Sequence, residues 1–165
     1  MSTVVEMRPN PEMTQKVNQA VRLLSREIKT KSMHDRLYDI TKASFTGIQL
    51  PPPEVFRHSY LNDDVHVKDF GSAVVGYALV GHRNEDPYVI SIATDPAYRG
   101  MGVGRQLLAA VIERAKWAKK NHVSLTCQID NPAQKLYYDS GFRVVGIAKD
   151  FYGDEGDGLM MRIEL

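Results

Sequence analysis

Three glycines at alternate positions are the feature of this sequence with the clearest chemical meaning. Gly100, Gly102 and Gly104 follow an apolar run and stand where a helical pattern begins. Glycines let backbone N–H groups approach a ligand closely, and the N–H groups at the start of a helix attract anions. The turn therefore predicts a phosphate or pyrophosphate site, with a purely structural tight turn as the alternative. Two nucleotide motifs fail here, because Arg105-Gln106 replaces the Lys-Ser/Thr of a phosphate loop and Arg105 replaces the third glycine of the dinucleotide fingerprint.

Two sequence blocks around and after this turn resemble the GNAT acetyltransferase superfamily. The family's acetyl-CoA signature, Arg/Gln-x-x-Gly-x-Gly/Ala after a strand, is matched by Arg99, Gly102 and Gly104. The segment from Asn131 to Phe142 resembles the family pattern Asn-x-x-Ala-x-x-Leu-Tyr-x-x-x-Gly-Phe. Both blocks occur in the family's order, and the resemblance covers residues 65–165. It implies an enzyme, a transferase that moves an acetyl group from acetyl-CoA to a primary amine.

The resemblance also implies which residues contact acetyl-CoA, the co-substrate. Backbone N–H groups of the glycine turn are expected to hold the pyrophosphate, and the end of the preceding strand to pair with the amide-bearing pantetheine arm. Arg99 and Arg105 would add positive charge, although Arg105 is equally compatible with a solvated place at the helix end. The expected contacts are Ile92, Ala93, Thr94, Arg99, Gly100, Met101, Gly102, Val103, Gly104, Arg105 and Asn131.

Asn131 departs from the family pattern, because it precedes the tyrosine by six positions where the pattern has seven. Either the loop is one residue shorter or Asp130 takes the place of the family asparagine. Asn131 is also well suited to cap a helix that starts at Pro132. Both roles can coexist.

Tyr137 is the general acid that the resemblance implies, four residues before Gly141. Attack of an amine on a thioester is helped by an acid that protonates the departing thiolate. A tyrosine, with a pKa of about 10, stays protonated at neutral pH and suits this task. The neighbouring Tyr138 would point elsewhere on a helix and is expected to pack against the core or the adenine side.

The general base is not identified by the sequence. Some family members carry a glutamate on the two strands that flank the glycine-turn helix, but residues 88–94 and 123–128 contain no carboxylate. A water relay ordered by Tyr88, Ser91 or Thr126 is the remaining option. Deprotonating a lysine at pH 7 costs about 4.6 kcal/mol and an α-amine of pKa near 8 about 1.4 kcal/mol. A weak base therefore favours α-amines.

The acceptor class stays open between a peptide N-terminus and a small-molecule amine. Residues 150–161 look like the last hairpin of protein N-terminal acetyltransferases, with Phe151 in place of the first of two tyrosines. Asp154, Glu155 and Asp157 could attract a cationic substrate, although a hairpin loop rich in Asp and Gly needs no such role. A non-catalytic acyl-CoA-binding module is a further alternative, and acetyl is not distinguished from longer acyl groups.

The elements that position these residues can be read from hydrophobic periodicity and from turn residues. Helices are predicted over residues 12–30, 33–45, 103–120 and 132–140. Strands are predicted over residues 3–7, 65–67, 73–80, 88–94, 122–128, 142–149 and 159–164. Residues 47–64, with prolines at 51–53, are expected to form a long extended connection that helps to shape the acceptor site.

The order of these elements predicts the fold class. Strand, helix, strand and helix over residues 88–140 imply parallel pairing there, whereas the predicted hairpins are antiparallel. We expect an α/β fold, with a mixed, mainly antiparallel sheet that has a parallel pair at the cofactor site and is flanked by helices. Residues 1–165 are expected to form a single domain. Gly76, inside a strand, indicates a bulge or a close backbone approach.

Composition narrows the classes of partner and site. The chain has 165 residues, with 21 Lys and Arg against 20 Asp and Glu, so no global field favours nucleic acid or an anionic membrane. No apolar stretch approaches the roughly 18 residues of a membrane span. The only cysteine, Cys127, is expected to be a buried inert thiol, and the five histidines show no metal-ligand spacing. We expect a cytoplasmic protein without a metal, and a homodimer stays open.

Overall fold

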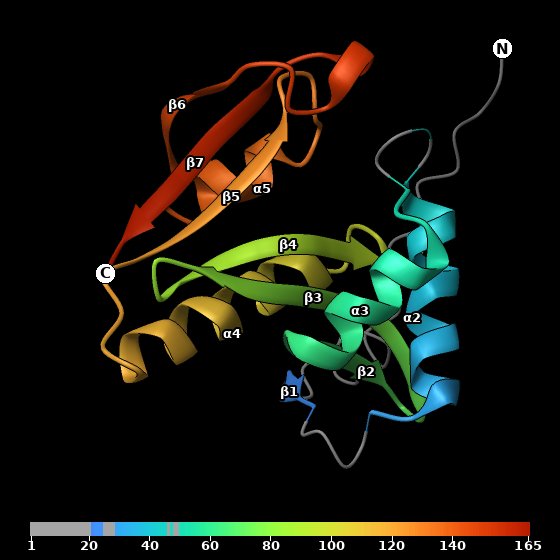
Figure 1. Cartoon of the computed structure of the whole chain (residues 1–165). Coiled ribbons are helices and arrows are strands. Elements are labelled where there is room, and N and C mark those ends of the chain that lie inside the picture. Colours follow the sequence, from blue (N-terminus) through green and yellow to red (C-terminus); the bar gives the residue numbers. More distant parts are fainter. Residues whose placement is uncertain (1–20, 25–28, 46, 48–49) are drawn as a thin grey trace, which may run out of the picture.

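A single mixed sheet organises the part of the chain that the computed structural model describes, residues 21–24, 29–45, 47 and 50–165. Within these residues, seven strands pair in the order β1-β2-β3-β4-β5-β7-β6. All neighbouring strands are antiparallel except β4 and β5, which are parallel. Figure 1 shows β4 in the middle of the molecule, with the β5-β7-β6 group on one side and β1-β2-β3 on the other.

The bounds of the elements follow the chain order. The strands are β1 (Arg22–Leu23), β2 (Asp64–Phe70), β3 (Ala73–Arg83), β4 (Asp86–Thr94), β5 (His122–Gln128), β6 (Arg143–Ala148) and β7 (Gly158–Glu164). The α-helices are α2 (Lys31–Ser44), α3 (Pro53–Asn62), α4 (Val103–Trp117) and α5 (Gln134–Asp139). Two short 3-10 helices are η3 (Pro96–Tyr98) and η4 (Gly153–Glu155).

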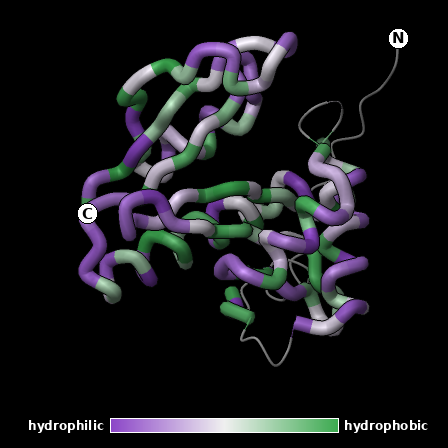
Figure 2. Tube along the Cα trace, viewed as in Figure 1, coloured by the Kyte–Doolittle hydropathy of each residue, from purple (hydrophilic) through white to green (hydrophobic). Residues whose placement is uncertain are grey.

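Helices cover both faces of the sheet because the central strands are apolar on both sides. On β3, Ala78 and Val80 join the cluster under α4 and α5, whereas Tyr77 and Leu79 join the cluster under α2 and α3. Successive side chains of a strand point to opposite faces, so β3 contributes to both clusters. The tube along β3 and β4 in Figure 2 is correspondingly hydrophobic.

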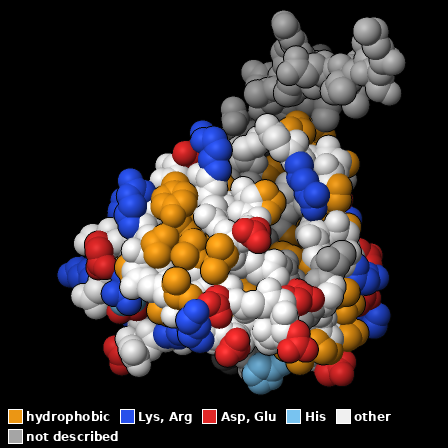
Figure 3. Space-filling model, turned by 90° about the horizontal axis from the view of Figure 1, so that it is seen from above, with side chains coloured by type: hydrophobic (Ala, Val, Ile, Leu, Met, Phe, Trp, Pro, Cys, Tyr) orange, Lys and Arg blue, Asp and Glu red, His pale blue; other side chains and the backbone are white. Residues whose placement is uncertain are grey.

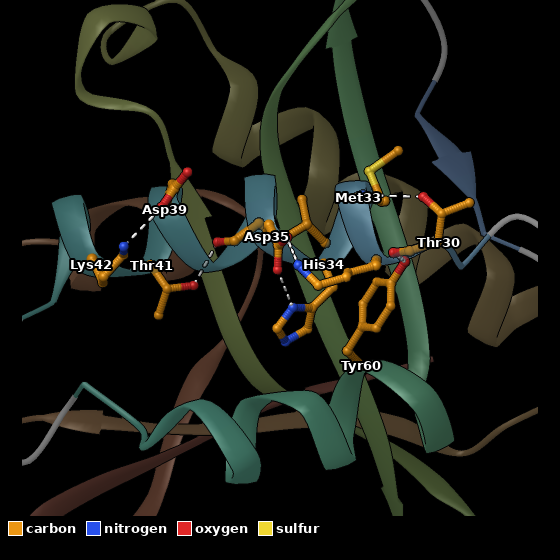
Figure 4. A network of polar contacts seen from close by, with 10 residues as sticks. Thr30, Met33, His34, Asp35, Asp39, Thr41, Lys42 and Tyr60 are labelled. Atoms are coloured by element: carbon orange, nitrogen blue, oxygen red, sulfur yellow. Dashed lines mark hydrogen bonds and ion pairs between the residues drawn. The ribbon is translucent and has the colours of Figure 1, made fainter.

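Helix α2 begins where the sequence offers a cap. The Thr30 side chain accepts a hydrogen bond from the Met33 N–H at 3.2 Å (Figure 4), which satisfies one of the unpaired donors of the first turn. Helix α4 begins at the glycine turn and buries six apolar residues of one stripe. These are Val103, Leu107, Leu108, Val111, Ile112 and Ala115.

The prediction for Gly76 is confirmed in both of its forms. The register of β2 against β3 shifts beside it, because Lys68 is opposite Gly76 and Asp69 is opposite Val74. A Cβ atom at position 76 would lie 2.7 Å from Val103 Cγ1, which real Cβ atoms do not tolerate. The missing side chain therefore lets α4 approach β3 closely.

The sequence prediction of fold class is confirmed, as is each predicted strand or helix from residue 33 onward except in the connection 47–64. The helix predicted over residues 103–120 ends at Trp117, and Ala118, whose spacing would continue the apolar stripe, is exposed. The strand predicted over residues 3–7 lies outside the described residues.

The helix predicted over residues 12–30 is wrong in its described part. Arg22 and Leu23 form β1, which pairs antiparallel with Val67 and His66 of β2. Residues 29–30 precede α2 without helical structure. The apolar spacing that indicated a helix includes Leu24, which is 4% exposed and packs in the cluster under α2 and α3. Pairing with the edge of β2 overrides the local helical pattern.

The extended connection predicted over residues 47–64 is also wrong, because residues 53–62 form helix α3. Proline cannot continue a helix, but at the first helical position its missing N–H has no intrahelical partner to lose. Pro53 occupies that position, and Phe56 and Tyr60, four residues apart, are buried on one face. The prolines therefore start a helix here.

Charged side chains of both signs are scattered over the face of the molecule seen in Figure 3, in keeping with a net charge of +1. Within the described residues, no helix is both long and apolar enough to cross a membrane. The same residues contain no group of three or more His, Cys, Asp or Glu side chains arranged to hold a metal ion.

Candidate active site

The sheet opens between its two parallel strands. Strands β4 and β5 pair only at Tyr88 with Ser124 and at Val89 with Leu125. The register of β4 against β3 shifts at the next residue, Ile90, and a bulge of this kind bends a strand. Figure 1 shows β4 and β5 diverging beyond this point. The later residues of both strands therefore stay paired with β3 and β7 but no longer pair with each other.

The glycine turn follows β4 and η3 and leads into α4. Gly100 and Gly102 adopt φ angles of 75° and 79°, in the left-handed region that favours glycine. The first helical hydrogen bond runs from Gln106 N–H to Gly102 O, and no side chain caps the helix. The N–H groups before Gln106 have no acceptor inside the helix and carry the positive end of its dipole. The turn therefore presents backbone donors suited to a diphosphate.

A groove of about 700 Å³ runs along this turn, between the ends of β4 and α5. Ten of the eleven residues predicted to contact acetyl-CoA line it, namely Ile92, Ala93, Thr94, Arg99, Gly100, Gly102, Val103, Gly104, Arg105 and Asn131. Met101 is the exception, since its side chain packs against the core cluster under α4.

The polar residues around the groove differ in how they are held. Arg99 donates to Thr94 O at 3.4 Å and to Ser44 Oγ at 3.2 Å, which fixes it across the end of β4. Arg105 is exposed and lies 3.8 Å from Asp139 on α5. Asn131 lines the groove, and its Oδ1 accepts a hydrogen bond from Ala133 N–H at 2.8 Å, so it also caps the turn that leads into α5.

A smaller cavity of about 200 Å³ adjoins the groove in the opening between β4 and β5. The groove and the cavity share four lining residues: Phe45, Ile92, Asn131 and Tyr137. Pro51 and three residues of α3 form part of the cavity wall, which supports the expectation that the segment 47–64 shapes this region. A ligand in the groove and a second ligand in the cavity would therefore meet beside Tyr137.

Tyr137 lies at this junction, held by α5 with 6% of its surface exposed. Burial raises the pKa of Tyr137, and the neighbouring Cys127 and Tyr152 add to the increase. Its hydroxyl forms no hydrogen bond with the described part of the chain, so it is available to a ligand. Tyr138 lines neither the groove nor the cavity, as the helical spacing predicted, but it is 40% exposed, so the expectation that it packs against the core is wrong.

A match to a family of known chemistry covers most of these elements. The model of the acetyltransferase (GNAT) family matches residues 34–142, from α2 to the end of the Tyr137 block. The chain belongs to the GNAT acetyltransferase family. Acetyl-CoA is therefore its co-substrate. The left-handed glycines, the unpaired N–H groups and the long groove fit such a ligand.

Relatives of this GNAT acetyltransferase are named for N-terminal acetylation. N-alpha-acetyltransferase RimI of Mycobacterium tuberculosis is 30% identical over 141 residues, which are 81% of this chain and 87% of that protein. A Bacillus subtilis protein, provisionally named a ribosomal protein bS18-alanine N-acetyltransferase, is 31% identical over 136 residues, 79% of this chain and 89% of the relative. The crystal structure of the ribosomal-protein-S18-alanine N-acetyltransferase of Escherichia coli has a TM-score of 0.75 at 18% identity, covering 88% of this chain and 92% of that chain.

The cavity of this GNAT acetyltransferase has a lining of apolar side chains and a few polar ones. Among the described residues that line it, the polar side chains are hydroxyls, an amide and a thiol. Ser91 and Thr126, two of the candidates for ordering a water, line the cavity, whereas Tyr88 lines an adjacent hollow under the Arg83 guanidinium. Burial raises the pKa of Cys127, in agreement with a buried inert thiol.

The C-terminal hairpin contributes Tyr152 to the cavity wall. Its hydroxyl donates to Thr126 O at 3.1 Å, and burial raises its pKa to about 12. Asp157 forms an ion pair with Lys149 at 2.6 Å and accepts a hydrogen bond from the Asp150 N–H. These contacts give Asp157 a structural role in the loop between β6 and β7.

Helix α2 and the residue that follows it lie beside both the groove and the cavity of this GNAT acetyltransferase, which the sequence did not indicate. Arg36 donates to Val74 O at 2.9 Å and to Asp95 Oδ2 at 2.6 Å, just before η3. Phe45 follows the helix and lines both the groove and the cavity. No sequence motif marked these residues, because their roles depend on packing against strands that lie far along the chain.

Proposed function

We propose that this acetyltransferase moves the acetyl group of acetyl-CoA to the α-amine of a peptide or protein N-terminus. The observation that carries the proposal is the meeting of a long groove with a separate cavity at Tyr137 and Asn131. The groove suits the extended co-substrate, and the cavity suits the end of an acceptor. The two reacting groups would come together where β4 and β5 part.

The shape beyond the cavity supports an extended acceptor over a small amine. A second hollow, lined in part by Arg83 and Tyr88, shares Ile90, Thr126 and Tyr152 with the cavity. A peptide whose first residue fills the cavity can continue along this hollow, whereas a small amine would leave it empty. The names of the Mycobacterium tuberculosis and Bacillus subtilis relatives agree with this choice.

The glycine turn and β4 are proposed to hold the co-substrate. The N–H groups of residues 100–105 would donate to the diphosphate, with the helix dipole of α4 adding to the attraction. Ile92, Ala93 and Thr94 line the groove where β4 pairs with β3 but no longer with β5, so the pantetheine amides would meet the backbone polar groups on the edge of β4 that faces β5. Arg99 adds positive charge at the same end.

The bound co-substrate supplies an activated acyl group whose carbonyl carbon is open to attack by an amine. A C–N bond forms at that carbon, the C–S bond breaks, and the sulfur leaves with the electron pair. Tyr137 donates its hydroxyl hydrogen toward this sulfur and is restored from solvent. Its raised pKa keeps it protonated at neutral pH, as this role requires. The surplus proton on the amine nitrogen passes to water in the cavity.

An acceptor panel tests the choice of substrate. Release of the CoA thiol is measured with an alanine-initiated tetrapeptide, the same peptide with a blocked N-terminus and an internal lysine, and a polyamine. We expect turnover only with the free α-amine, because the described residues that line the cavity offer no carboxylate base for a lysine-type amine. Preferred turnover of the polyamine would refute the peptide assignment, and acetyl-CoA binding without any thiol release would favour a non-catalytic binding module.

A matched pair of variants tests the acid. Tyr137→Phe should lower kcat about 100-fold, the lower end of what a general acid contributes, with little change in the KM for acetyl-CoA. Tyr138→Phe, the exposed neighbour on the same helix, serves as the control and should leave kcat intact. Equal kcat for the two variants would remove Tyr137 from the acid role.

A further inference from the structure

Three hydroxyl groups form a chain beside the acceptor cavity. The Tyr77 hydroxyl on β3 lies 3.0 Å from Ser91 Oγ on β4 and 2.7 Å from Thr41 Oγ1 on α2. Thr41 Oγ1 in turn lies 2.8 Å from Leu37 O, one turn earlier in the same helix (Figure 4). Tyr77 and Thr41 are 0% exposed, whereas Ser91 lines the cavity. The chain therefore runs from the cavity into the core.

The carbonyl at the inner end fixes the direction of every hydrogen bond in the chain. A carbonyl oxygen carries no hydrogen, so the close contact of Thr41 Oγ1 with Leu37 O requires the threonine hydrogen to lie between them. Thr41 then offers only lone pairs to Tyr77, and Tyr77 must donate to it. Tyr77 in turn offers only lone pairs to Ser91, so Ser91 donates to Tyr77.

Ser91 therefore faces the cavity with lone pairs and without a hydrogen. An amine ready for attack has N–H groups that need acceptors and one lone pair that must stay free for the thioester carbon. A hydroxyl that donated to the nitrogen would occupy that lone pair. A hydroxyl that can only accept binds an N–H instead and leaves the nitrogen nucleophilic.

We propose that Ser91 accepts one N–H of the acceptor amine, and that Tyr77 and Thr41 are positioning residues that keep the Ser91 hydrogen turned away from the cavity. The inference rests on the proposed function, because it assumes that the amine enters this cavity. The chain ends at a helix carbonyl, so it has no outlet for a proton. It orients the amine and does not act as the base.

Steady-state kinetics with acetyl-CoA and an alanine-initiated peptide test the proposal. Ser91→Ala removes the acceptor and should raise the peptide KM about three- to tenfold, the size of one neutral hydrogen bond, with the acetyl-CoA KM unchanged. Tyr77→Phe frees the Ser91 hydrogen to turn into the cavity and should raise the peptide KM by a similar factor. The double variant should show no further increase, because Tyr77 acts only through Ser91.

A change deep in the core gives an independent test. Thr41→Val leaves Ser91 and Tyr77 in place but removes the acceptor of the Tyr77 hydrogen. Tyr77 then donates to Ser91, and the direction of the chain reverses. We expect the peptide KM to rise severalfold, although Thr41 does not line the cavity.

The control is Tyr60→Phe, which removes another buried hydroxyl, bonded to Thr30 O at 3.0 Å and unconnected to Ser91. It should leave both KM values unchanged. An unaltered peptide KM in Ser91→Ala, or additive increases in the double variant, would overturn the inference while the wild-type turnover still supports the proposed function. Absence of peptide turnover by the wild type would refute the proposed function and the inference together.

Discussion

Replacing Gly102 by alanine separates the role of the glycine turn in stability from its role in binding. Gly102 precedes α4 with a φ of 79° and lines the groove proposed for acetyl-CoA. A Cβ atom there would meet nothing closer than Gln106 Nε2 at 3.9 Å, so the change causes no clash. The cost to the folded protein is therefore the left-handed backbone alone.

The loss of stability in Gly102→Ala can be compared with the loss at a second left-handed glycine, Gly71. A left-handed conformation costs a non-glycine residue about 1–2 kcal/mol, and the lower entropy of the unfolded alanine chain offsets part of it. We expect a net loss of about 1 kcal/mol, which lowers Tm by about 2–4 °C in a chain of this length. Gly71, in the β2–β3 turn, has a φ of 60° and no atom within 4 Å of an added Cβ, so Gly71→Ala should cost the same.

The two variants should differ in binding. In Gly102→Ala, relaxation of the strained turn misaligns the unpaired N–H groups at the start of α4, and the affinity for CoA should fall at least tenfold, which is about 1.4 kcal/mol. In Gly71→Ala the affinity should equal that of the wild type. Thermal unfolding and titration calorimetry with CoA measure both quantities. Equal Tm losses with equal CoA affinities would refute the assignment of the diphosphate to this turn.

Three other features give separate tests. Burial lowers the pKa of His66 to about 4, so between pH 6.5 and pH 4 the unfolded state takes up a proton that the folded state does not. The free energy of unfolding should therefore fall by up to about 3 kcal/mol over this pH range, and urea unfolding of His66→Gln should not show this fall. Cys127, with its raised pKa, should resist alkylation at pH 7.5 until the protein is unfolded, as followed by mass spectrometry. Asp86 accepts from the Asn121 N–H at 2.8 Å, so Asp86→Ala should lower the urea midpoint more than the surface change Asp139→Ala; equal midpoints would contradict this.

The sequence predicted the C-terminal two thirds of the fold well because local patterns and tertiary packing agree there. The strand 122–128 is confirmed at both ends, and the apolar stripe that indicated α4 is buried as far as Ala115. The glycine turn, Asn131 and Tyr137 could be placed because two motifs name them in order. The structure brings these elements to one groove.

The failures occur where a distant partner decides the local structure. Arg22 and Leu23 carry a helical spacing, yet the free edge of β2 takes them as a strand. The prolines at 51–53 suggested an extended chain, but Pro53 begins α3 because Phe56 and Tyr60 have a core to enter. The hydroxyl chain could not be foreseen either, since Thr41, Tyr77 and Ser91 come from three separate elements.

The short pairing of β4 with β5 has a consequence for how the two parts of the sheet are linked. Only two residue pairs link the backbones of the β5-β7-β6 group and the β1-to-β4 group within the sheet, although side chains of both groups share the core cluster under α4. A co-substrate arm hydrogen-bonded to the free edge of β4, with an acceptor beside it, would lie between these two groups of strands and contact both. Binding of the co-substrate and the acceptor should then slow amide hydrogen exchange in both groups of strands at once, because the two ligands together bridge the gap in the sheet.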